Sequence, residues 1–232
     1  MNRKYYALFL VLLLGFFFTL TFYNLAELGN PSGLNQHYIA EGVKDTGAIN
    51  LVTAILFDYR GFDTLGEATV ILAAAAALSF LVPKKRIPML ATRFTIIVYQ
   101  AIALILPIMV LLGFYLIVFG HLSPGGGFTG GVVLATIPIL LTITYGISLA
   151  EDKFNYRQKA ILESSGALTF VLLGLLGILT GSAFLASGQT NLSLGIPGNL
   201  ISSGLIPYFN LAVGLKVSAG LAIIFNSLIK ED

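Results

Sequence analysis

Long apolar segments alternate with short polar ones along almost the whole chain. Six of these segments are long enough to cross about 30 Å of hydrocarbon as a helix that rises ~1.5 Å per residue. They are residues 5–25, 64–82, 94–119, 128–149, 160–183 and 203–228. The pattern therefore predicts an all-α polytopic membrane protein with about six transmembrane helices.

One further apolar segment, residues 47–57, is too short to be a span. As a helix it would reach roughly 16 Å, about half of the thickness required. We expect a short helix that lies along the outer interface or dips into it, broken at Asp58–Asp63. The backbone groups freed at that break must be buried in protein, because lipid offers them no hydrogen bonds.

The basic residues predict the orientation of the six spans. Only Lys44 and Arg60 fall on the side opposite the N-terminus, and Lys216 falls inside a span. All the others fall on the N-terminal side: Arg3, Lys4, Lys84, Lys85, Arg86, Arg93, Lys153, Arg157, Lys159 and Lys230. Since basic loops stay on the cytoplasmic side, we expect both termini to be cytoplasmic.

Composition narrows the class further. The chain has 232 residues, of which 56% are hydrophobic and 10% charged, with a mean hydropathy of +0.90. These values exclude a soluble domain and favour a multi-pass protein of the cell membrane. The absence of cysteine excludes disulfides and thiolate metal sites, and the two histidines are too few for a haem pair or a His-rich metal centre. We expect no cofactor and no nucleic-acid partner.

A single linker divides the chain. Residues 83–88 read Pro-Lys-Lys-Arg-Ile-Pro, between the second and third spans. We predict a two-span unit at 1–83 that includes the broken helix, a cytoplasmic linker at 84–92, and a four-span unit at 93–232. Small residues at 73–77 and 177–181 allow close helix packing. So much small-residue surface on a thin bundle indicates neighbours from other chains.

Charge is concentrated just before the second span. Asp58, Arg60, Asp63 and Glu67 fall within ten positions. One interpretation is a site that holds or relays a cation or proton, with Arg60 adjusting the carboxylates. The alternative is a charged surface turn, in which Arg60 pairs with an aspartate and Thr64 and Glu67 form a capping box. Glu67 favours function, because it leads into the apolar helix about 22 Å from the inner end.

A glycine-rich stretch, residues 120–131, separates the third and fourth spans. Gly125, Gly127 and Gly130 formally match a dinucleotide-binding motif, but membrane spans on both sides exclude the strands that the motif requires. The stretch instead predicts a tight turn with positive φ, where backbone packs closely against another segment. His121 within it is either a titratable relay or a hydrogen-bonded pin, and we favour the pin.

Two charged residues fall inside the four-span unit. Lys216 lies about 18 Å from the inner end of its span, which is deep for snorkelling. It is either a proton carrier or a fixed charge paired with a carboxylate on another subunit. Glu163 lies about one turn into the fifth span, ~13 Å below Lys216, too far for a direct pair unless the helices are offset. It is equally consistent with an ordinary interfacial acid.

Two long motifs carry a family resemblance that covers nearly the whole chain. Residues 50–67 (NLVTAILFDYRGFDTLGE) resemble the C-terminal part of the large A subunit of Mrp-type multisubunit sodium/proton antiporters. They are also similar to the equivalent small subunit of archaeal membrane-bound hydrogenases. From about residue 93 onward, with GHLSPGGGFTGG at 120–131 and GLKV at 214–217, the chain resembles the Mrp B subunit and its hydrogenase counterpart. Here the two units are joined, whereas in most relatives they are separate.

The resemblance implies a subunit of a membrane assembly related to respiratory complex I. In such assemblies the module exchanges protons for sodium, in some cases driven by electron transfer in hydrogenase or sulfur-reducing subunits. The chain would not be an enzyme by itself. Glu67, with Asp58 and Asp63 beside it, would bind sodium transiently or relay protons at an outer half-path, and Arg60 would compensate the carboxylates.

Lys216, with Glu163 and His121, would belong to a second path or to its lining. An alternative function is a structural adaptor that joins antiporter modules without carrying ions, in which the charged residues make pairs between subunits. A free-standing solute transporter would have inverted repeats and a central substrate site, and the sequence shows neither.

Overall fold

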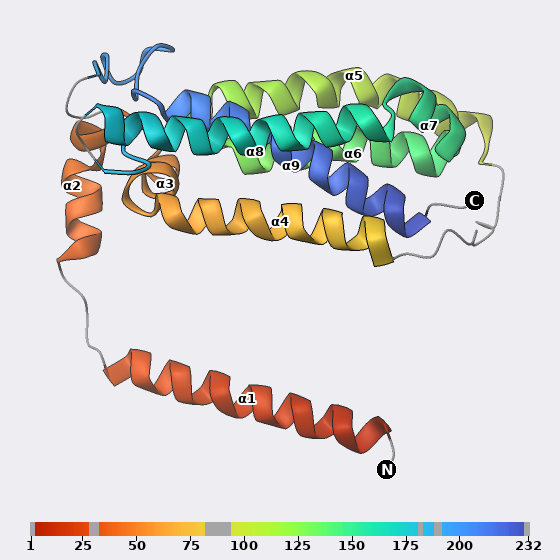
Figure 1. Ribbon diagram of the computed structural model, residues 1–232, viewed down its shortest axis with the longest axis horizontal. Coiled ribbons are helices and arrows are strands. Elements are labelled where there is room, and N and C mark those ends of the chain that lie inside the picture. The colour runs from red at the N-terminus through yellow and green to blue at the C-terminus, as the bar shows by residue number, and fades with distance from the viewer. Residues whose placement is uncertain (1–2, 28–32, 82–93, 181–182, 188–191, 230–232) are drawn as a thin grey trace. The chain divides into compact units, whose positions relative to one another are not determined.

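The computed structural model of the chain is built from helices (Figure 1). It describes residues 3–27, 33–81, 94–180, 183–187 and 192–229, and no strand occurs among them. The helices are α1 (Arg3–Glu27), α2 (Leu34–Thr46), α3 (Leu51–Ala54), the π-helix η1 (Ile55–Tyr59), α4 (Gly61–Leu81), α5 (Ile96–Val118), α6 (Gly127–Tyr145), α7 (Ile147–Lys153), α8 (Tyr156–Leu179) and α9 (Ile206–Ile229). The predicted all-α class is confirmed.

The chain forms two compact units, Met1–Ala40 and Glu41–Asp232. The first contains α1, a 25-residue helix with the apolar stretch Val11–Tyr23, and it corresponds to the first predicted span. In the second unit, α4, α5, α6, α8 and α9 are each long and apolar enough to cross a membrane. The expected count of about six spans agrees with these helices.

Several helix boundaries differ from the expected ones. α4 begins at Gly61, three residues before the predicted start, and α8 begins at Tyr156 instead of residue 160. The predicted fourth span ends early, at Tyr145, because Gly146 adopts φ +92° and redirects the chain into the short helix α7. The early start of α8 follows from a capping box formed by Asn155 and Gln158.

The short helix expected before the second span is present. It begins at Leu51, where the Asn50 side chain accepts a hydrogen bond from Val52 N, and it continues through η1 to Tyr59. Arg60, with φ −126° and ψ 35°, interrupts it at the predicted place. The patterns did not predict α2, a polar helix tied to η1 by a 2.8 Å hydrogen bond from Tyr59 to Asp45. The predicted linker at 84–92 lies outside the described residues.

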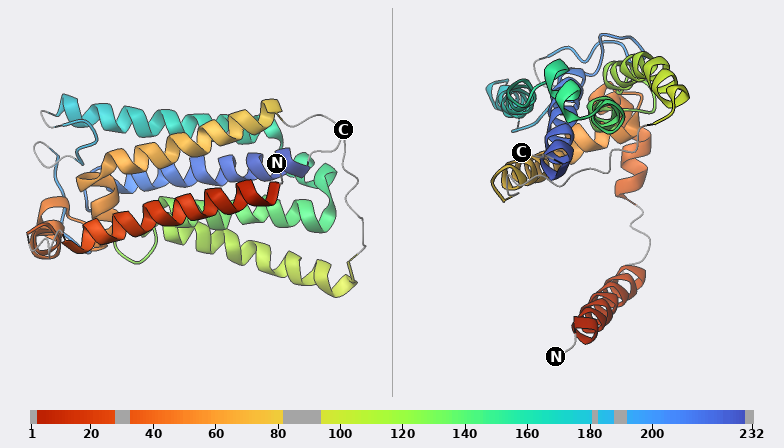
Figure 2. Two further views of the ribbon diagram at one scale, coloured as in Figure 1. Left: turned by 90° about the horizontal axis from the view of Figure 1, so that it is seen from below. Right: turned by 90° about the vertical axis from the view of Figure 1, so that its right-hand side faces the viewer.

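Helix α9 is the centre of the second unit. It packs against α4, α5, α6 and α8, and Figure 2 shows the blue helix with α8, α4 and α6 around it. Three aromatic rings form part of the core, with centroid separations of 5.9 Å between Phe57 and Phe209 and 5.0 Å between Phe170 and Phe209. These rings join η1, α8 and α9, so the short broken helix is part of the bundle.

The glycine-rich stretch makes the close approach that its composition predicted. Gly126 has φ +131°, and Gly127 packs directly on the backbone of Asn210. A Cβ at Gly131 would lie 2.9 Å from the Gly214 carbonyl oxygen. A helix, α5, precedes the stretch, so it is not a dinucleotide-binding motif. Its glycines allow α6 to pack closely against α9.

Candidate functional site

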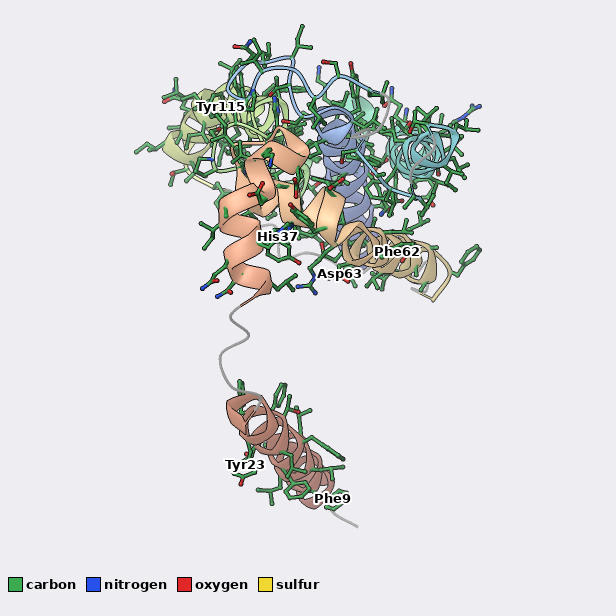
Figure 3. All side chains as sticks on the ribbon, turned by 90° about the vertical axis from the view of Figure 1, so that its left-hand side faces the viewer. Phe9, Tyr23, His37, Phe62, Asp63 and Tyr115 are labelled. Carbon is green, nitrogen blue, oxygen red and sulfur yellow. The ribbon has the colours of Figure 1, made fainter. Side chains whose placement is uncertain are left out.

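The acidic cluster before α4 does not converge on one site within this chain. Arg60 and Asp63 form an ion pair with exposed side chains, 62% and 49% accessible. Asp63 is labelled in Figure 3, next to Phe62 in the first turn of α4. Asp58 instead turns inward, and its Oδ1 accepts a 3.0 Å hydrogen bond from Ser187 N. Glu67 is exposed on α4. Asp58 therefore holds a distant segment, while the other three residues face outward.

Of the surface-turn alternative, the pairing of Arg60 with an aspartate is present, but the capping box of Thr64 and Glu67 is not. Because α4 begins at Gly61, Thr64 lies inside the helix, where it is buried. Its hydroxyl donates a 2.6 Å hydrogen bond to the Leu56 carbonyl oxygen in η1. This side-chain hydrogen bond ties the first turn of α4 to η1.

The buried charges gather between α8 and α9. Glu163 and Lys216 are 5% and 1% accessible. Glu163 Oε1 and Lys216 Nζ have no hydrogen-bond partner among the described residues, although the two charges interact electrostatically. Unpartnered buried charges are costly, so they indicate a site with a task.

Two glycines allow this arrangement. A Cβ at Gly220 would lie 2.6 Å from Glu163 Oε1, and one at Gly166 would lie 2.9 Å from Lys216 Cβ. Glu163 thus reaches α9 one helical turn beyond Lys216. The sequence placed the two residues about 13 Å apart along the membrane normal. Close packing of α8 on α9 brings them near enough to interact without a direct ion pair.

A second group of buried polar residues was not predicted from the sequence. Lys159 is 1% accessible and donates a 2.6 Å hydrogen bond to Glu151 Oε1. Asn226 Nδ2 donates to the same oxygen at 2.9 Å, and Tyr156 N donates to Glu151 Oε2 at 2.8 Å. Thr142 completes the group with a 3.2 Å hydrogen bond to Asn226 Oδ1. The group joins α6, α7, α8 and α9.

The carboxylate of Glu151 is held in its charged form. Burial by itself would raise its pKa, but hydrogen bonds from Lys159 and Asn226, together with the Lys159 charge, bring the pKa below its ordinary value. The signal that could have revealed the group is the four-residue spacing of Lys159 and Glu163. That spacing places both on one face of a helix, provided the helix begins before residue 160.

Together the two groups form an alternating file of four charges, which we call the charge file: Glu151, Lys159, Glu163 and Lys216. Lys159 and Glu163 are about 6 Å apart along α8. Only the Glu151 side chain within the charge file is substantially open to water, at 27% accessible. The formal charges cancel, which lowers the cost of holding four ionised groups in an apolar bundle.

His121 is separate from the charge file. It is fully buried in the turn between α5 and α6, at the opposite end of the bundle from α7 (Figure 1). Its Nε2 lies 3.2 Å from the Leu200 carbonyl oxygen, and burial lowers its pKa. Nδ1 is buried without a hydrogen-bond partner in the described structure. These contacts agree with the hydrogen-bonded pin.

The described residues contain no cluster of three or more histidine, cysteine or acidic side chains that could hold a metal ion. The charge file consists of one direct ion pair, Lys159–Glu151, and two deeper charges, Glu163 and Lys216, that interact without a direct pair. Such a set of charges can move a proton or a small cation by changing which charges are paired.

Two family models match adjacent parts of the chain. Residues 97–223 match a domain related to the MnhB subunit of Na+/H+ antiporter, and residues 2–93 match MbhE, the E subunit of MBH. The MnhB match contains Lys159, Glu163 and Lys216, and the MbhE match contains the acidic cluster before α4.

Similar proteins come from several organisms. An "Uncharacterized protein" of Methanocaldococcus jannaschii is 34% identical, over 86% of this chain and 83% of its own length. The "Probable K(+)/H(+) antiporter" A/B subunit of Rhizobium meliloti is 25% identical over 85% of this chain, which spans 23% of that relative. The "Putative antiporter subunit mnhB2" of Staphylococcus aureus strain MRSA252 is 30% identical, over 54% of this chain and 87% of its own length.

Two solved structures share the fold. A chain of the membrane-bound sulfane sulfur reductase, an archaeal respiratory membrane complex, matches over 100% of both chains with 29% identity and a TM-score of 0.76. A chain of the Mrp complex from Dietzia sp. DQ12-45-1b matches with 22% identity and a TM-score of 0.76, over 100% of this chain and 26% of its own. The chain thus belongs to the family of membrane proteins related to the MnhB subunit of Na+/H+ antiporters.

Proposed function

We propose that this chain is a membrane subunit of a Mrp-like cation/proton antiporter module, and that protons or cations move through the bundle along its charge file. The observation that supports this most is that two charged side chains, Glu163 and Lys216, are buried while Glu163 Oε1 and Lys216 Nζ have no hydrogen-bond partner among the described residues. A purely structural bundle would replace them with apolar residues at little cost or even a gain in stability. The relatives named as antiporter subunits support the same role.

The proposed mechanism begins with the mutual compensation of Glu163 and Lys216. When a proton or a cation neutralises Glu163, Lys216 becomes an uncompensated charge in a low-dielectric interior. Release of a proton from its ammonium group relieves that cost. Neutralisation at one residue is thereby coupled to deprotonation at the other, which is the elementary requirement of an exchange mechanism.

The residues around Glu67 supply the outer part of the proposed path. Glu67 is exposed on a helix that is long and apolar enough to span the membrane, so in an assembly its carboxylate needs a partner or a wet cavity. We assign it transient sodium binding or proton relay, with Asp63 one turn away. Other subunits would complete this site.

We place the chain in the cell membrane with both termini cytoplasmic, so that Glu151 opens toward the cytoplasm. The units are residues 1–83 and 93–232, joined by the linker at 84–92. The parent assembly would be a complex I-related respiratory complex of the hydrogenase or sulfur-reducing type, in which the module exchanges sodium for protons. The likeness to a chain of the sulfane sulfur reductase supports this placement.

The test is sodium-dependent proton movement in vesicles that contain the intact complex, isolated through a tag on this chain. Glu163→Gln and Lys216→Gln should each abolish exchange while the subunit composition stays unchanged. The matched control is Asp152→Asn, because Asp152 is an exposed acid on α7 and should not matter. Unimpaired exchange in both buried-site variants would remove the charge file from the mechanism.

The adaptor function is the second candidate, because Arg60, just before α4, and Asp63 and Glu67, in its first turns, are exposed where a neighbouring subunit could contact them. Under this alternative, Glu67→Gln and Lys216→Ala release neighbouring subunits from the purified complex. Loss of exchange from a complex that remains whole favours the antiporter path instead.

A further inference from the structure

The Glu151–Lys159 pair closes the end of the charge file that meets water. Glu151 is 27% accessible at its side chain, while Lys159 beside it is 1% accessible. The ammonium also lies 5.8 Å from the centre of the Phe154 ring, a favourable position for a cation. Any ion that enters from this end meets Glu151 first and finds its inner oxygen already occupied by Lys159.

Lys159 has a second acceptor within reach. Glu163 follows it by four residues on α8, a spacing that puts side chains about 5–6 Å apart at Cβ. Glu163 Oε1 is buried and makes no hydrogen bond to the described residues, so it is an acceptor that Lys159 could use. A change of side-chain rotamer can carry the Lys159 charge from one carboxylate to the other without moving the helix.

The carboxylate oxygen that binds the Lys159 ammonium, Glu151 Oε1, is also in contact with the Asn226 amide. Glu151 offers its carboxylate, and Asn226 offers an amide that is 2.9 Å from Glu151 Oε1. If this amide turns over, its oxygen faces Glu151 and its NH2 group faces the Thr142 hydroxyl. In that arrangement Thr142 accepts from the amide and donates its one hydroxyl proton to the Pro138 carbonyl oxygen, 2.9 Å away. Carboxylate and amide oxygens are suitable ligands for a hard monovalent cation.

We propose that Glu151 and Asn226 form a binding site for a monovalent cation, and that Lys159 is a tethered plug that occupies this site until the cation displaces it toward Glu163. The inference rests on the proposed function in taking the bound cation to be the transported one and in assigning the released proton to Lys216. The displacement balances charge, because Glu151 then pairs with the cation and Glu163 with Lys159. Lys216 is left without its counter-charge and gives up one proton for each cation bound.

The plug lowers the apparent affinity of the site, because the cation must compete with a built-in positive charge. Removing the plug should therefore tighten binding. We would measure equilibrium binding of radiolabelled sodium to the intact purified complex, and count as site-specific the part that Glu151→Gln abolishes. Parallel measurements with potassium determine which of the two ions the site prefers.

In Lys159→Gln, the site-specific sodium binding should reach half-saturation at a sodium concentration about tenfold or more below that of the unmodified complex. Lys153→Gln is the control, since Lys153 is exposed on the last turn of α7 and its substitution makes the same change in charge. The control should bind sodium like the unmodified complex. Equal half-saturation in Lys159→Gln and Lys153→Gln overturns the plug.

A second variant keeps the proposal testable if Lys159→Gln does not assemble. Asn226→Leu removes the amide ligand but leaves the Glu151–Lys159 pair in place, so site-specific binding should weaken by about tenfold, the effect typical of lost ligand support. Unchanged binding in Asn226→Leu overturns the site. The proposed function is tested separately, by ion exchange in vesicles. If Glu163→Gln and Lys216→Gln exchange ions at the full rate, the proposed function is overturned, whereas the binding results for Lys159→Gln and Asn226→Leu still decide the cation site, because binding is measured without exchange.

Discussion

The position of the Glu163 carboxylate depends on the absence of a side chain at residue 220, which gives a sharp prediction for Gly220→Ala. The new Cβ would lie 2.6 Å from Glu163 Oε1 and 2.9 Å from Ile71 Cγ2. Ordinary contact begins at about 3.4 Å, so the carboxylate must retreat by about 0.8 Å. It would then lose its fixed position relative to Lys216.

The expected loss of stability is small. The atoms that must move are the end of the flexible Glu163 side chain and, by less, the Ile71 Cγ2 methyl group, so the overpacking cost should be near the lower end of about 1–3 kcal/mol. Replacing glycine by alanine inside a helix raises the free energy of unfolding by up to about 1 kcal/mol, which offsets part of this cost. The effect on exchange should be larger, about tenfold or more, because a shift of this size misplaces a reacting group.

The assay combines the thermal unfolding midpoint of the purified complex with the rate of sodium-dependent proton movement in vesicles. Gly66→Ala is the matched control, since a Cβ on this exposed position of α4 would meet nothing within 4 Å. It should stabilise the helix by about 0.5–1 kcal/mol and leave exchange unchanged. If Gly220→Ala exchanges at the normal rate, the position of Glu163 against α9 has no part in transport.

Three further predictions concern stability. Phe209→Ala removes the ring that contacts both Phe57 and Phe170, and should cost about 3–5 kcal/mol by thermal or denaturant unfolding. Burial holds the pKa of His121 below its ordinary value, so its contribution to stability is complete above about pH 6.5 and is lost as pH falls through the lowered pKa. Melting temperatures from pH 7.5 to 5 should fall less steeply in His121→Gln than in the unmodified protein. Asn155→Ala removes the capping box of α8 and should cost about 1 kcal/mol in the same thermal assay, whereas an unchanged melting temperature would show that the cap is redundant.

The spans were predictable because each needs a long apolar segment, and because a segment that crosses a bilayer must satisfy its own backbone hydrogen bonds, which a helix does. The helix ends were less predictable, because they depend on local hydrogen bonds that hydropathy does not register. Asn155 and Gln158 start α8 early, and Gly146 ends α6 early. α2 was not predictable in this way because it is polar, and hydropathy marks only apolar segments.

The candidate site was predicted only in part. Glu163 and Lys216 stood out as charges in apolar segments, but their relative position depends on glycines that let α8 and α9 approach. Lys159 was assigned to a cytoplasmic loop because the fifth span was expected to begin at residue 160, and the structure buries it instead. Glu151 and Asn226 are 75 positions apart in sequence, and only tertiary packing brings them together.

The burial of α9 also constrains how the protein is made. Its segment carries Asn210, Lys216 and Asn226, all shielded by neighbouring helices. A lone segment with a lysine near its middle partitions poorly from the translocon into lipid, at a cost of roughly 2.5–3.5 kcal/mol for that residue. The ribosome makes α9 after α4, α5, α6 and α8, the helices that pack around it. A helix that carries three buried polar side chains therefore enters the bilayer after the helices that cover it, and a defect in any of these helices should leave α9 outside the bilayer.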